Sequence, residues 1–470
     1  MSYRHGIYVT ERATDLIALS RQAAGVTLAI GTAPVHLASD PAGANEPVLC
    51  RTYNEAVSKL GYSTDTGKWT LCEAMEVLFG QYQIAPVVFV NVFDPTSAAH
   101  TSEGTKDFKV GADHTYELKD DDLIANTIVV EGATPTITAT DEGALLTFAS
   151  TVTTATTLHA TYNTVNMTSE TMKAAVLGGV DANTGQAKGL ELVKEIYPRF
   201  ELTVGQIIAP GFSQYSDVGL KMAAKAEDIN GHFSALAIAD LDTTTVRTYS
   251  QAAAAKNANG WTSAHLAVCY PMVSYGGRRQ WLSTHMAGLM SKVAQADNDI
   301  PFRSPSNHAL YIDGMIRADG TNCYFGREEA NDLNGQGIVT VLRQDGWQLW
   351  GNRTSIYPSS TDPKDCWINV RRMFDYVKAA LVLNFQSRID EPITLRNIES
   401  VVNSVNTYLN GLVSAGAILG GRVAFLEEDN SEPDLMDGKL NFRCYFTPPS
   451  PAREINFNLE YDRSYLTTVF

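Results

Sequence analysis

The chain has 470 residues, a length typical of roughly two to four domains, and 44% of its residues are apolar. This apolar share is sufficient for sizeable cores and excludes a disordered or fibrous protein. The 52 acidic residues outnumber the 36 basic ones, and the resulting net charge of −16 disfavours binding to nucleic-acid backbones or anionic lipid.

Membrane insertion and export are also disfavoured by the sequence. No stretch approaches the roughly 18 consecutive apolar residues that a membrane-spanning helix needs. The first residues, Met1 to Gly6, are not followed by the apolar core of a signal peptide. The six cysteines are scattered, so reduced and mostly buried thiols are expected.

The first segment contains a short alternation of apolar and polar residues, with Ile7 and Val9 on one face. We expect residues 1–20 to form a strand-like N-terminal arm. A compact region follows from residue 21, and its first strand is expected over Val26 to Gly31.

A helix and a buried strand continue this compact region. Thr70 and Glu73 have the spacing of a capping box, which predicts a helix beginning there. The apolar run from Val87 to Phe93 predicts a buried strand.

The composition changes near Pro95. Residues 97–170 are rich in threonine and contain short strand-like pieces, such as Thr127 to Glu131, between glycines. We interpret this region as a small β domain inserted into a larger one. Binding of carbohydrate or of a host surface is an alternative use of its threonine-rich faces.

Residues 172–324 alternate apolar strands with helical stretches. Such alternation predicts a parallel sheet covered on both faces, and hence an inserted α/β domain. The strands are expected at 204–209, 235–239 and 266–270, and the helices at 219–230, 246–259 and 279–296.

The last third contains two long helices and two strands. One helix is expected to begin at Asp362 and Pro363 and to run past Trp367, and the second begins near Pro392. Strands are expected at 422–426 and 440–446.

The most regular pattern lies near the C-terminus. From Glu454 to Asp462 polar and apolar residues alternate without exception, which predicts a half-buried strand. A proline-rich spacer, Thr447 to Pro451, separates this strand from the preceding one. A strand held away from its own domain is suited to pairing with another chain. Its apolar face is formed by Ile455, Phe457, Leu459 and Tyr461.

The best enzymatic candidate is the pair Asp240 and Asp242, which directly follows an apolar strand. Open α/β folds bind ligands at this end of their strands, and phosphatases of the haloacid-dehalogenase type place a nucleophilic carboxylate there. The alternative is that both aspartates cap the helix expected from about Val246. The nine histidines do not cluster and no phosphate-binding loop is present, so we expect no catalytic, metal or cofactor site.

One segment resembles a known family. Leu333 to Leu342, the Asp345-Gly346 turn and Leu349 to Thr354 are similar to the hallmark segment of contractile phage tail sheath proteins. The residues that carry the resemblance form a Trp-Gly-x-Arg-Thr motif: Trp350, Gly351, Arg353 and Thr354. We interpret the segment as a β-hairpin followed by Arg353, placed to hold backbone carbonyls or a carboxylate.

Other segments resemble the same family in the same order. They are Gly6 to Val9, Gly25 to Gly31, Trp367 to Arg372, and Glu391 with Pro392. The resemblance implies an α+β / α/β multidomain fold with strand-forming arms at both termini. The implied parts are an arm over 1–20, a discontinuous core domain from 21–95 plus 325–451, inserted domains over 97–170 and 172–324, and an arm over 452–470.

The resemblance further implies a structural subunit rather than an enzyme. Such subunits polymerise helically around a tail tube through exchanged terminal strands and contract to drive the tube through a cell envelope. The implied partners are other copies of the chain, the tail tube protein, and baseplate and tail terminator proteins. Assembly in the host cytoplasm into a virion is expected, with no direct contact to nucleic acid and no membrane insertion.

Overall fold

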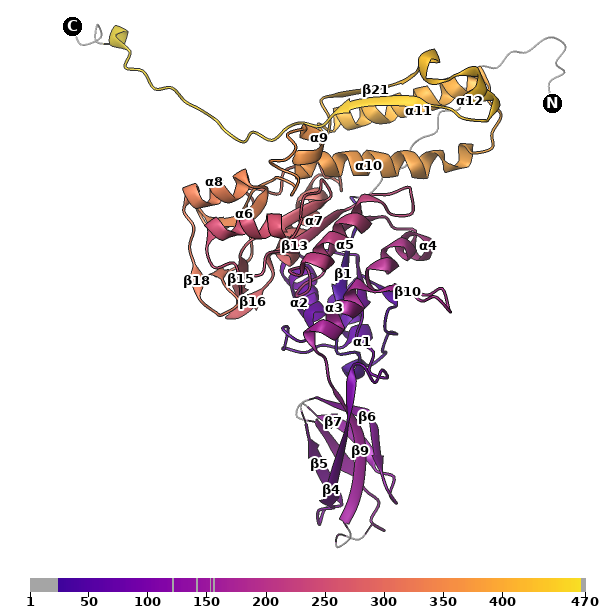
Figure 1. Cartoon of the computed structure of the whole chain (residues 1–470), viewed down its shortest axis with the longest axis vertical. Helices are drawn as coiled ribbons and strands as arrows, with labels where there is room; N and C mark the ends of the chain where they lie inside the picture. Colours follow the sequence, from indigo (N-terminus) through magenta and orange to yellow (C-terminus); the bar gives the residue numbers. More distant parts are fainter. Residues whose placement is uncertain (1–23, 121, 141–142, 153, 155–156, 466–470) are drawn as a thin grey trace, which may run out of the picture.

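The computed structural model describes residues 24–120, 122–140, 143–152, 154 and 157–465. Figure 1 shows a central unit, a small β unit at one end and a largely helical C-terminal unit at the other. The mixed α+β, multidomain fold class expected from the sequence is confirmed by these several sheets and their helices.

The central unit is built on an eight-stranded sheet in the order β2-β3-β1-β12-β13-β14-β19-β20. The six inner strands are parallel, and the edge strands β2 and β20 are antiparallel to their neighbours. The strands are β1 (Val26–Gly31), β2 (Pro47–Cys50), β3 (Val87–Asn91), β12 (Val204–Ile208), β13 (Leu236–Asp240), β14 (Leu266–Cys269), β19 (Ile338–Arg343) and β20 (Trp347–Trp350).

Helices cover both faces of this sheet, which explains why its inner strands are apolar on both sides. In β1, Ala29 contributes to the core on one face, and Leu28 and Ile30 contribute to the core on the other. The helices are α1 (Tyr53–Leu60), α2 (Thr70–Met75), α3 (Ser169–Leu177), α4 (Ile196–Phe200), α5 (Ser216–Glu227), α6 (Tyr249–Ala258), α7 (Leu282–Ala296) and α8 (Arg327–Gly335).

The sheet differs from the predicted domain division. Residues 172–324 were expected to form a separate inserted α/β domain, but β12, β13 and β14 complete the same sheet as β1 and β19. Since β1 pairs with β3 on one side and β12 on the other, neither segment has a complete sheet alone. The predicted strands are therefore present, but they belong to the same sheet as β1 and β19 rather than to a sheet of their own.

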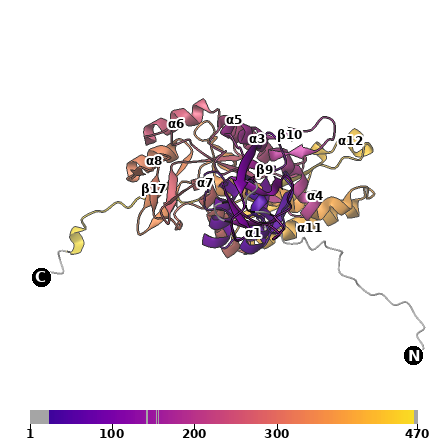
Figure 2. The ribbon, with the colours of Figure 1, turned by 90° about the horizontal axis from the view of Figure 1, so that it is seen from below.

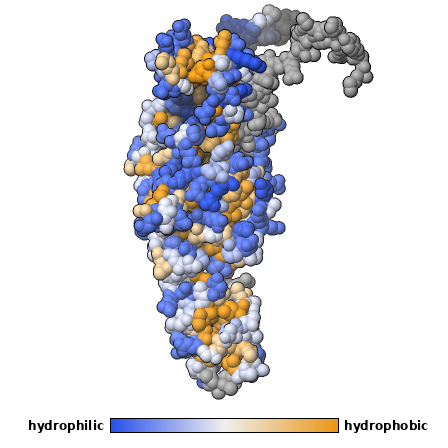
Figure 3. All heavy atoms as spheres, turned by 90° about the vertical axis from the view of Figure 1, so that its right-hand side faces the viewer, coloured by the Kyte–Doolittle hydropathy of each residue, from blue (hydrophilic) through white to orange (hydrophobic). Residues whose placement is uncertain are grey.

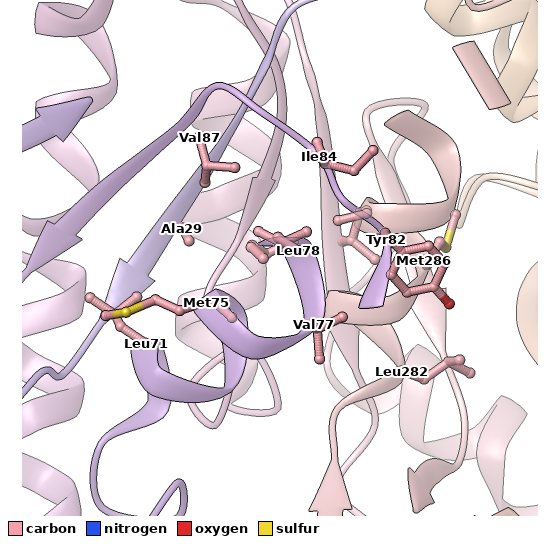
Figure 4. Packing of buried hydrophobic residues seen from close by; sticks show 14 of the residues in the cluster. Ala29, Leu71, Met75, Val77, Leu78, Tyr82, Ile84, Val87, Leu282 and Met286 are labelled. Carbon is pink, nitrogen blue, oxygen red and sulfur yellow. The ribbon is translucent and has the colours of Figure 1, made fainter. Parts of the chain in front are cut away.

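The helix expected at Thr70 is also present, without the capping box. The hydroxyl of Thr70 accepts a hydrogen bond from the backbone N–H of Thr32, and Glu73 accepts one from the backbone N–H of Trp281. Both side chains thus join the helix to other elements. Figure 4 shows Leu71 and Met75 of α2 in the same core, together with Leu78 from the helical turn Glu76–Gln81 that continues α2.

The β unit packs two three-stranded sheets, β4-β9-β6 and β5-β8-β7, around a core of its own. Its strands are β4 (Thr101–Lys109), β5 (Thr115–Lys119), β6 (Leu123–Val130), β7 (Thr136–Thr140), β8 (Gly143–Thr147) and β9 (Thr157–Val165). Two smaller sheets border the central unit, from β10 (Gly179–Val180) and β11 (Ala187–Lys188), and from β15 (Met272–Tyr275), β16 (Arg278–Gln280), β17 (Gly314–Ile316) and β18 (Asn322–Cys323).

The C-terminal unit packs two long helices against a two-stranded sheet. Its elements are α9 (Pro363–Cys366), α10 (Ile368–Phe385), α11 (Leu395–Ser414), β21 (Gly420–Phe425), α12 (Glu432–Met436) and β22 (Phe442–Thr447). The helix expected to run past Trp367 is broken there, because the extended backbone of Trp367 forms a bridge with Arg353. No helix in the described part of the chain is long and apolar enough to span a bilayer.

Candidate assembly interface

The C-terminal segment leaves the body of the protein after β22, as the views in Figures 1 and 2 show. Residues 448–462 form neither helix nor strand. The alternating side chains are among the most exposed large hydrophobic residues described: Ile455 is 70% exposed, Phe457 84%, Leu459 95% and Tyr461 77%. The described residues of one chain therefore provide no partner for the strand expected here.

An unpaired strand of this kind is unfavourable in water. Over residues 448–462 its backbone joins no strand ladder, and four large side chains remain solvated. Addition to the edge of an existing sheet would satisfy the backbone and cover one face of the segment. The segment, called the C-terminal arm below (residues 452–465), therefore has the chemistry of a strand that another chain completes.

The sheet of β21 and β22 has the complementary property. Its two strands pair from Gly420 with Thr447 to Phe425 with Phe442. No third strand joins them among the residues that the structure describes, although the N–H of Val423 in β21 donates to Oδ1 of Asn406 in α11. Both edges therefore lack a strand partner. One face packs on α10 and α11 through Val423 and its neighbours, so the sheet is already anchored.

Figure 3 shows hydrophobic side chains gathered at the top of one face of the molecule, over the C-terminal unit. The exposed large hydrophobic residues of this unit include Ile389, Leu395, Leu419 and Met436, which are 62%, 72%, 70% and 84% exposed. Exposed apolar side chains in such number are typical of an association surface.

Ile7 and Val9, the sequence-predicted residues of the N-terminal arm, lie outside the described residues. Their pairing with a neighbouring subunit stays a prediction.

The hallmark segment forms the predicted β-hairpin between β19 and β20. Asp345 and Gly346 form its turn with positive φ angles of 49° and 114°, a conformation that Asp-Gly pairs favour. Gly351 follows with a φ of 124°, and a Cβ atom there would lie 2.3 Å from the side-chain amide of Asn334 and 3.2 Å from Cα of Val339. The positive φ and the close approach to Val339 both favour glycine at this position of the motif.

The remaining motif residues connect this hairpin to the C-terminal unit. Thr354 is fully buried, and its hydroxyl donates a hydrogen bond of 2.6 Å to the carbonyl oxygen of Asp365. Trp350 pairs with Thr340 at the end of the hairpin. The motif therefore connects the central sheet to the C-terminal unit.

Arg353 does not take the role predicted for it. Its guanidinium lies 3.4 Å from the ring centroid of Trp367 and 4.3 Å from that of Tyr357, and Nη1 donates to Sγ of Cys366 at 2.7 Å. No carboxylate of the described residues lies within ion-pair distance. Aromatic stacking, rather than a carbonyl or carboxylate, fixes this side chain.

The carbonyl-binding role belongs instead to Lys256 of α6, which sequence reasoning missed. Its ammonium group donates to the carbonyl oxygens of Gln336, Ser355 and Tyr357 and is 2% exposed. Burial lowers the pKa of Lys256 to about 8, so the group remains charged at pH 7. The signal in the sequence is spacing alone, since Lys256 lies four residues after Ala252 and so shares its buried helix face.

The aspartate pair is not arranged as a catalytic site. Asp240 is 3% exposed, and its carboxylate accepts hydrogen bonds from the hydroxyl of Ser213 (3.1 Å) and the backbone N–H of Ser283 (2.9 Å). It therefore caps α7 rather than the helix expected from Val246. Asp242 bonds Thr244 within its own turn. No group of three or more potential metal ligands occurs in the described ranges.

Replacing Asp240 with asparagine is expected to leave the protein at least as stable at pH 7. Burial raises the pKa of Asp240 from 3.8 to about 6, so the folded state binds this proton more tightly than the unfolded state does. Stability is therefore lost as pH rises from about 4 to 6, by roughly 3 kcal/mol. Urea denaturation between pH 4 and 7 should show this fall in the native protein and a smaller one in Asp240→Asn. Equal slopes would contradict the assignment.

A folded α/β body, a sheet that no third strand joins among the described residues and an exposed apolar C-terminal segment are typical of a self-associating structural subunit. Comparison with known proteins agrees. A family model described as the phage tail sheath C-terminal domain matches residues 360–461. The tail sheath protein of Burkholderia phage BcepMu is 27% identical over 492 aligned residues, covering 100% of this chain and 98% of that protein.

A putative prophage major tail sheath protein of Pseudomonas aeruginosa strain UCBPP-PA14 is 31% identical over 314 residues, which cover 64% of this chain and 76% of that protein. The chain therefore belongs to the phage tail sheath protein family. This membership confirms the resemblance and the prediction of a structural, non-enzymatic subunit, and it gives no support to a phosphatase. The protein is a sheath component of a phage tail or a related injection system.

Solved structures show the same fold. The contracted helical sheath of the anti-feeding prophage matches with a TM-score of 0.60 at 15% identity, over 98% of this chain and 100% of that chain. The sheath of the PVC extracellular contractile injection system, also contracted, matches with a TM-score of 0.59 at 14% identity, over 99% of both chains.

Proposed function

We propose that the chain polymerises into a helical sheath around a tail tube by exchanging terminal strands. The observation that supports this most directly is the C-terminal arm, with its exposed apolar row on an otherwise folded protein. The open edges of the β21–β22 sheet are the acceptor that we assign to it. One edge would take the C-terminal arm of a second copy, and the other the N-terminal arm around Ile7 and Val9 of a third.

An exchange of this kind joins unlike surfaces on successive copies. Such head-to-tail contacts do not close on themselves, and they generate an open helix when each copy repeats the same rotation. Because the arm joins its unit through Pro448, Pro449 and Pro451, the spacer is stiff and the strand can reach beyond its own body. In this scheme the arms link neighbouring copies, and the C-terminal unit of each copy accepts them. The β unit of residues 101–165 projects from the opposite end of the molecule (Figure 1).

The proposed action is mechanical. The sheath assembles in an extended state and contracts as subunits repack, with paired arms acting as hinges, and drives the tube through the target envelope. The solved relatives are described as contracted sheaths, and one related structure is a baseplate of the anti-feeding prophage. By extension, we propose the tube protein, baseplate and tail terminator as partners and the host cytoplasm as the place of assembly.

Deleting residues 452–470 tests this function. The deletion removes no described core residue, so the variant is expected to stay folded and to fail to form tubes at concentrations where the full chain forms them. Electron microscopy and pelleting measure assembly, and circular dichroism checks the fold. Tubes formed by the deletion variant would overturn the strand-exchange proposal.

A further inference from the structure

A hollow of about 920 Å³ lies at the root of the C-terminal arm. It is lined by the hallmark segment Trp350–Arg353 with Trp367, and by the end of the proline spacer and the start of the arm, residues 449–454. The loop 302–308 and the end of α8 complete the lining. We call this hollow the arm-root groove.

The arm-root groove is cationic. Arg303, Arg353 and Arg453 line it, against the single carboxylate of Glu454. Arg303 is paired with Asp297 at 2.7 Å, and Arg453 is paired with Glu454 at 3.3 Å. Arg353 alone among these arginines has no carboxylate partner within the described part of the chain.

Two groups in the groove are fixed and incompletely satisfied. Stacking between Trp367 and Tyr357 holds the planar guanidinium of Arg353 in one orientation, so little entropy is lost when it binds an anion. Asn352 is 5% exposed and donates from Nδ2 to Asn369 at 2.8 Å. Its Oδ1 is buried and accepts no hydrogen bond from the described residues, so Arg353 is the group that a docking peptide can reach.

The groove therefore presents a preorganised fork for a carboxylate. A peptide loop that carries acidic side chains supplies this complementary group. This chain contains such a loop between β21 and β22. Within residues 427–437 it has six carboxylates and no basic residue, and Met436 is 84% exposed. Glu428 and Asp429 pair with Arg443, and Asp437 pairs with Lys439. The other three carboxylates have no basic partner among the described residues, and they are those of Glu427, Glu432 and Asp434.

We propose that the arm-root groove is a binding site for the acidic β21–β22 connection, residues 427–437 including α12, of a second copy of this chain. A carboxylate of that loop binds the guanidinium of Arg353. The contact rests on the proposed self-assembly. This ion pair between two copies would hold them together beside the exchanged arm. It joins unlike surfaces of the two copies, as a helical polymer requires.

Assembly of Arg353→Gln is the first test. The variant is expected to raise the critical concentration for tube formation at least tenfold and to make assembly less sensitive to salt. Arg343→Gln is the matched control, since Arg343 also stacks on a tryptophan, Trp347 at 5.3 Å, but lies outside the groove. Should Arg353→Gln fail to fold, Arg453→Glu reverses a charge on a 63% exposed side chain of the groove and is expected to act alike.

Carbodiimide cross-linking is the second test. In tubes grown from an equal mixture of ¹⁴N- and ¹⁵N-labelled Arg453→Lys chains, the new amine is expected to form mixed-isotope cross-links to residues 427–437. If Arg353→Gln forms tubes at the same critical concentration as the wild-type chain, or if tubes contain no such cross-links, the groove proposal is overturned. The strand-exchange proposal would be unaffected by either result. Tubes formed without residues 452–470 would instead overturn strand exchange.

Discussion

Replacing Lys256 with methionine is expected to lower the free energy of unfolding by about 3 kcal/mol. The methionine preserves the apolar stem but leaves the carbonyl oxygens of Gln336, Ser355 and Tyr357 without their ammonium donor. Each unsatisfied buried carbonyl costs about 1–3 kcal/mol, partly offset by relief of the buried charge. Urea denaturation at pH 7 measures the loss.

Lys225→Met is a suitable control. Lys225 lies on α5 and is paired with Glu191 at 2.8 Å, but its side chain is 31% exposed. A pair of this exposure contributes at most about 1 kcal/mol. Equal destabilisation by the two substitutions would contradict the structural role of Lys256.

Replacing Phe457 and Leu459 together with asparagine is expected to abolish tube formation without changing the stability of the single chain. Both side chains are more than four-fifths exposed, so the folded subunit loses no packing. In a paired arm, burying each contributes roughly 1.5–3 kcal/mol, and the loss of both weakens the contact by at least about 100-fold. Pelleting over a range of protein concentrations measures the change in critical concentration.

The opposite face of the same arm provides the control. Asn456→Ser with Asn458→Ser alters the same stretch of strand but spares the apolar row, so tubes are expected at nearly the native concentration. If both double variants assemble equally well, the apolar row does not carry the contact.

The six parallel strands of the central sheet could be predicted from the sequence because they are apolar runs, whereas the edge strand β2 was not predicted. The run around Ile207 and the run around Ile238 both appear as parallel strands. The pairing of β12 with β1 could not be predicted, since it joins residues about 180 positions apart and nothing in either run specifies its neighbour. The break at Trp367 was missed for the same reason, because the bridge that causes it comes from Arg353.

The candidate interface was predictable only where its pattern is local. The alternation from Ile455 to Tyr461 is visible in the sequence, but its pairing depends on a partner that one chain does not contain. The surroundings of Arg353 and Lys256 depend on tertiary contacts. From sequence, the arginine of the motif was expected to bind an anion or a carbonyl oxygen. In the fold Arg353 stacks on Trp367, and Lys256 of α6 donates to the carbonyl oxygens instead.

Amide hydrogen exchange of residues 454–462 in assembled tubes tests strand exchange most directly. In the single chain these residues form no strand, so their amides are expected to exchange at nearly the rate of an unfolded peptide. In tubes, ladder hydrogen bonds with a neighbouring sheet should slow the exchange at least about 100-fold. Equally fast exchange in tubes and in the free subunit would contradict the account.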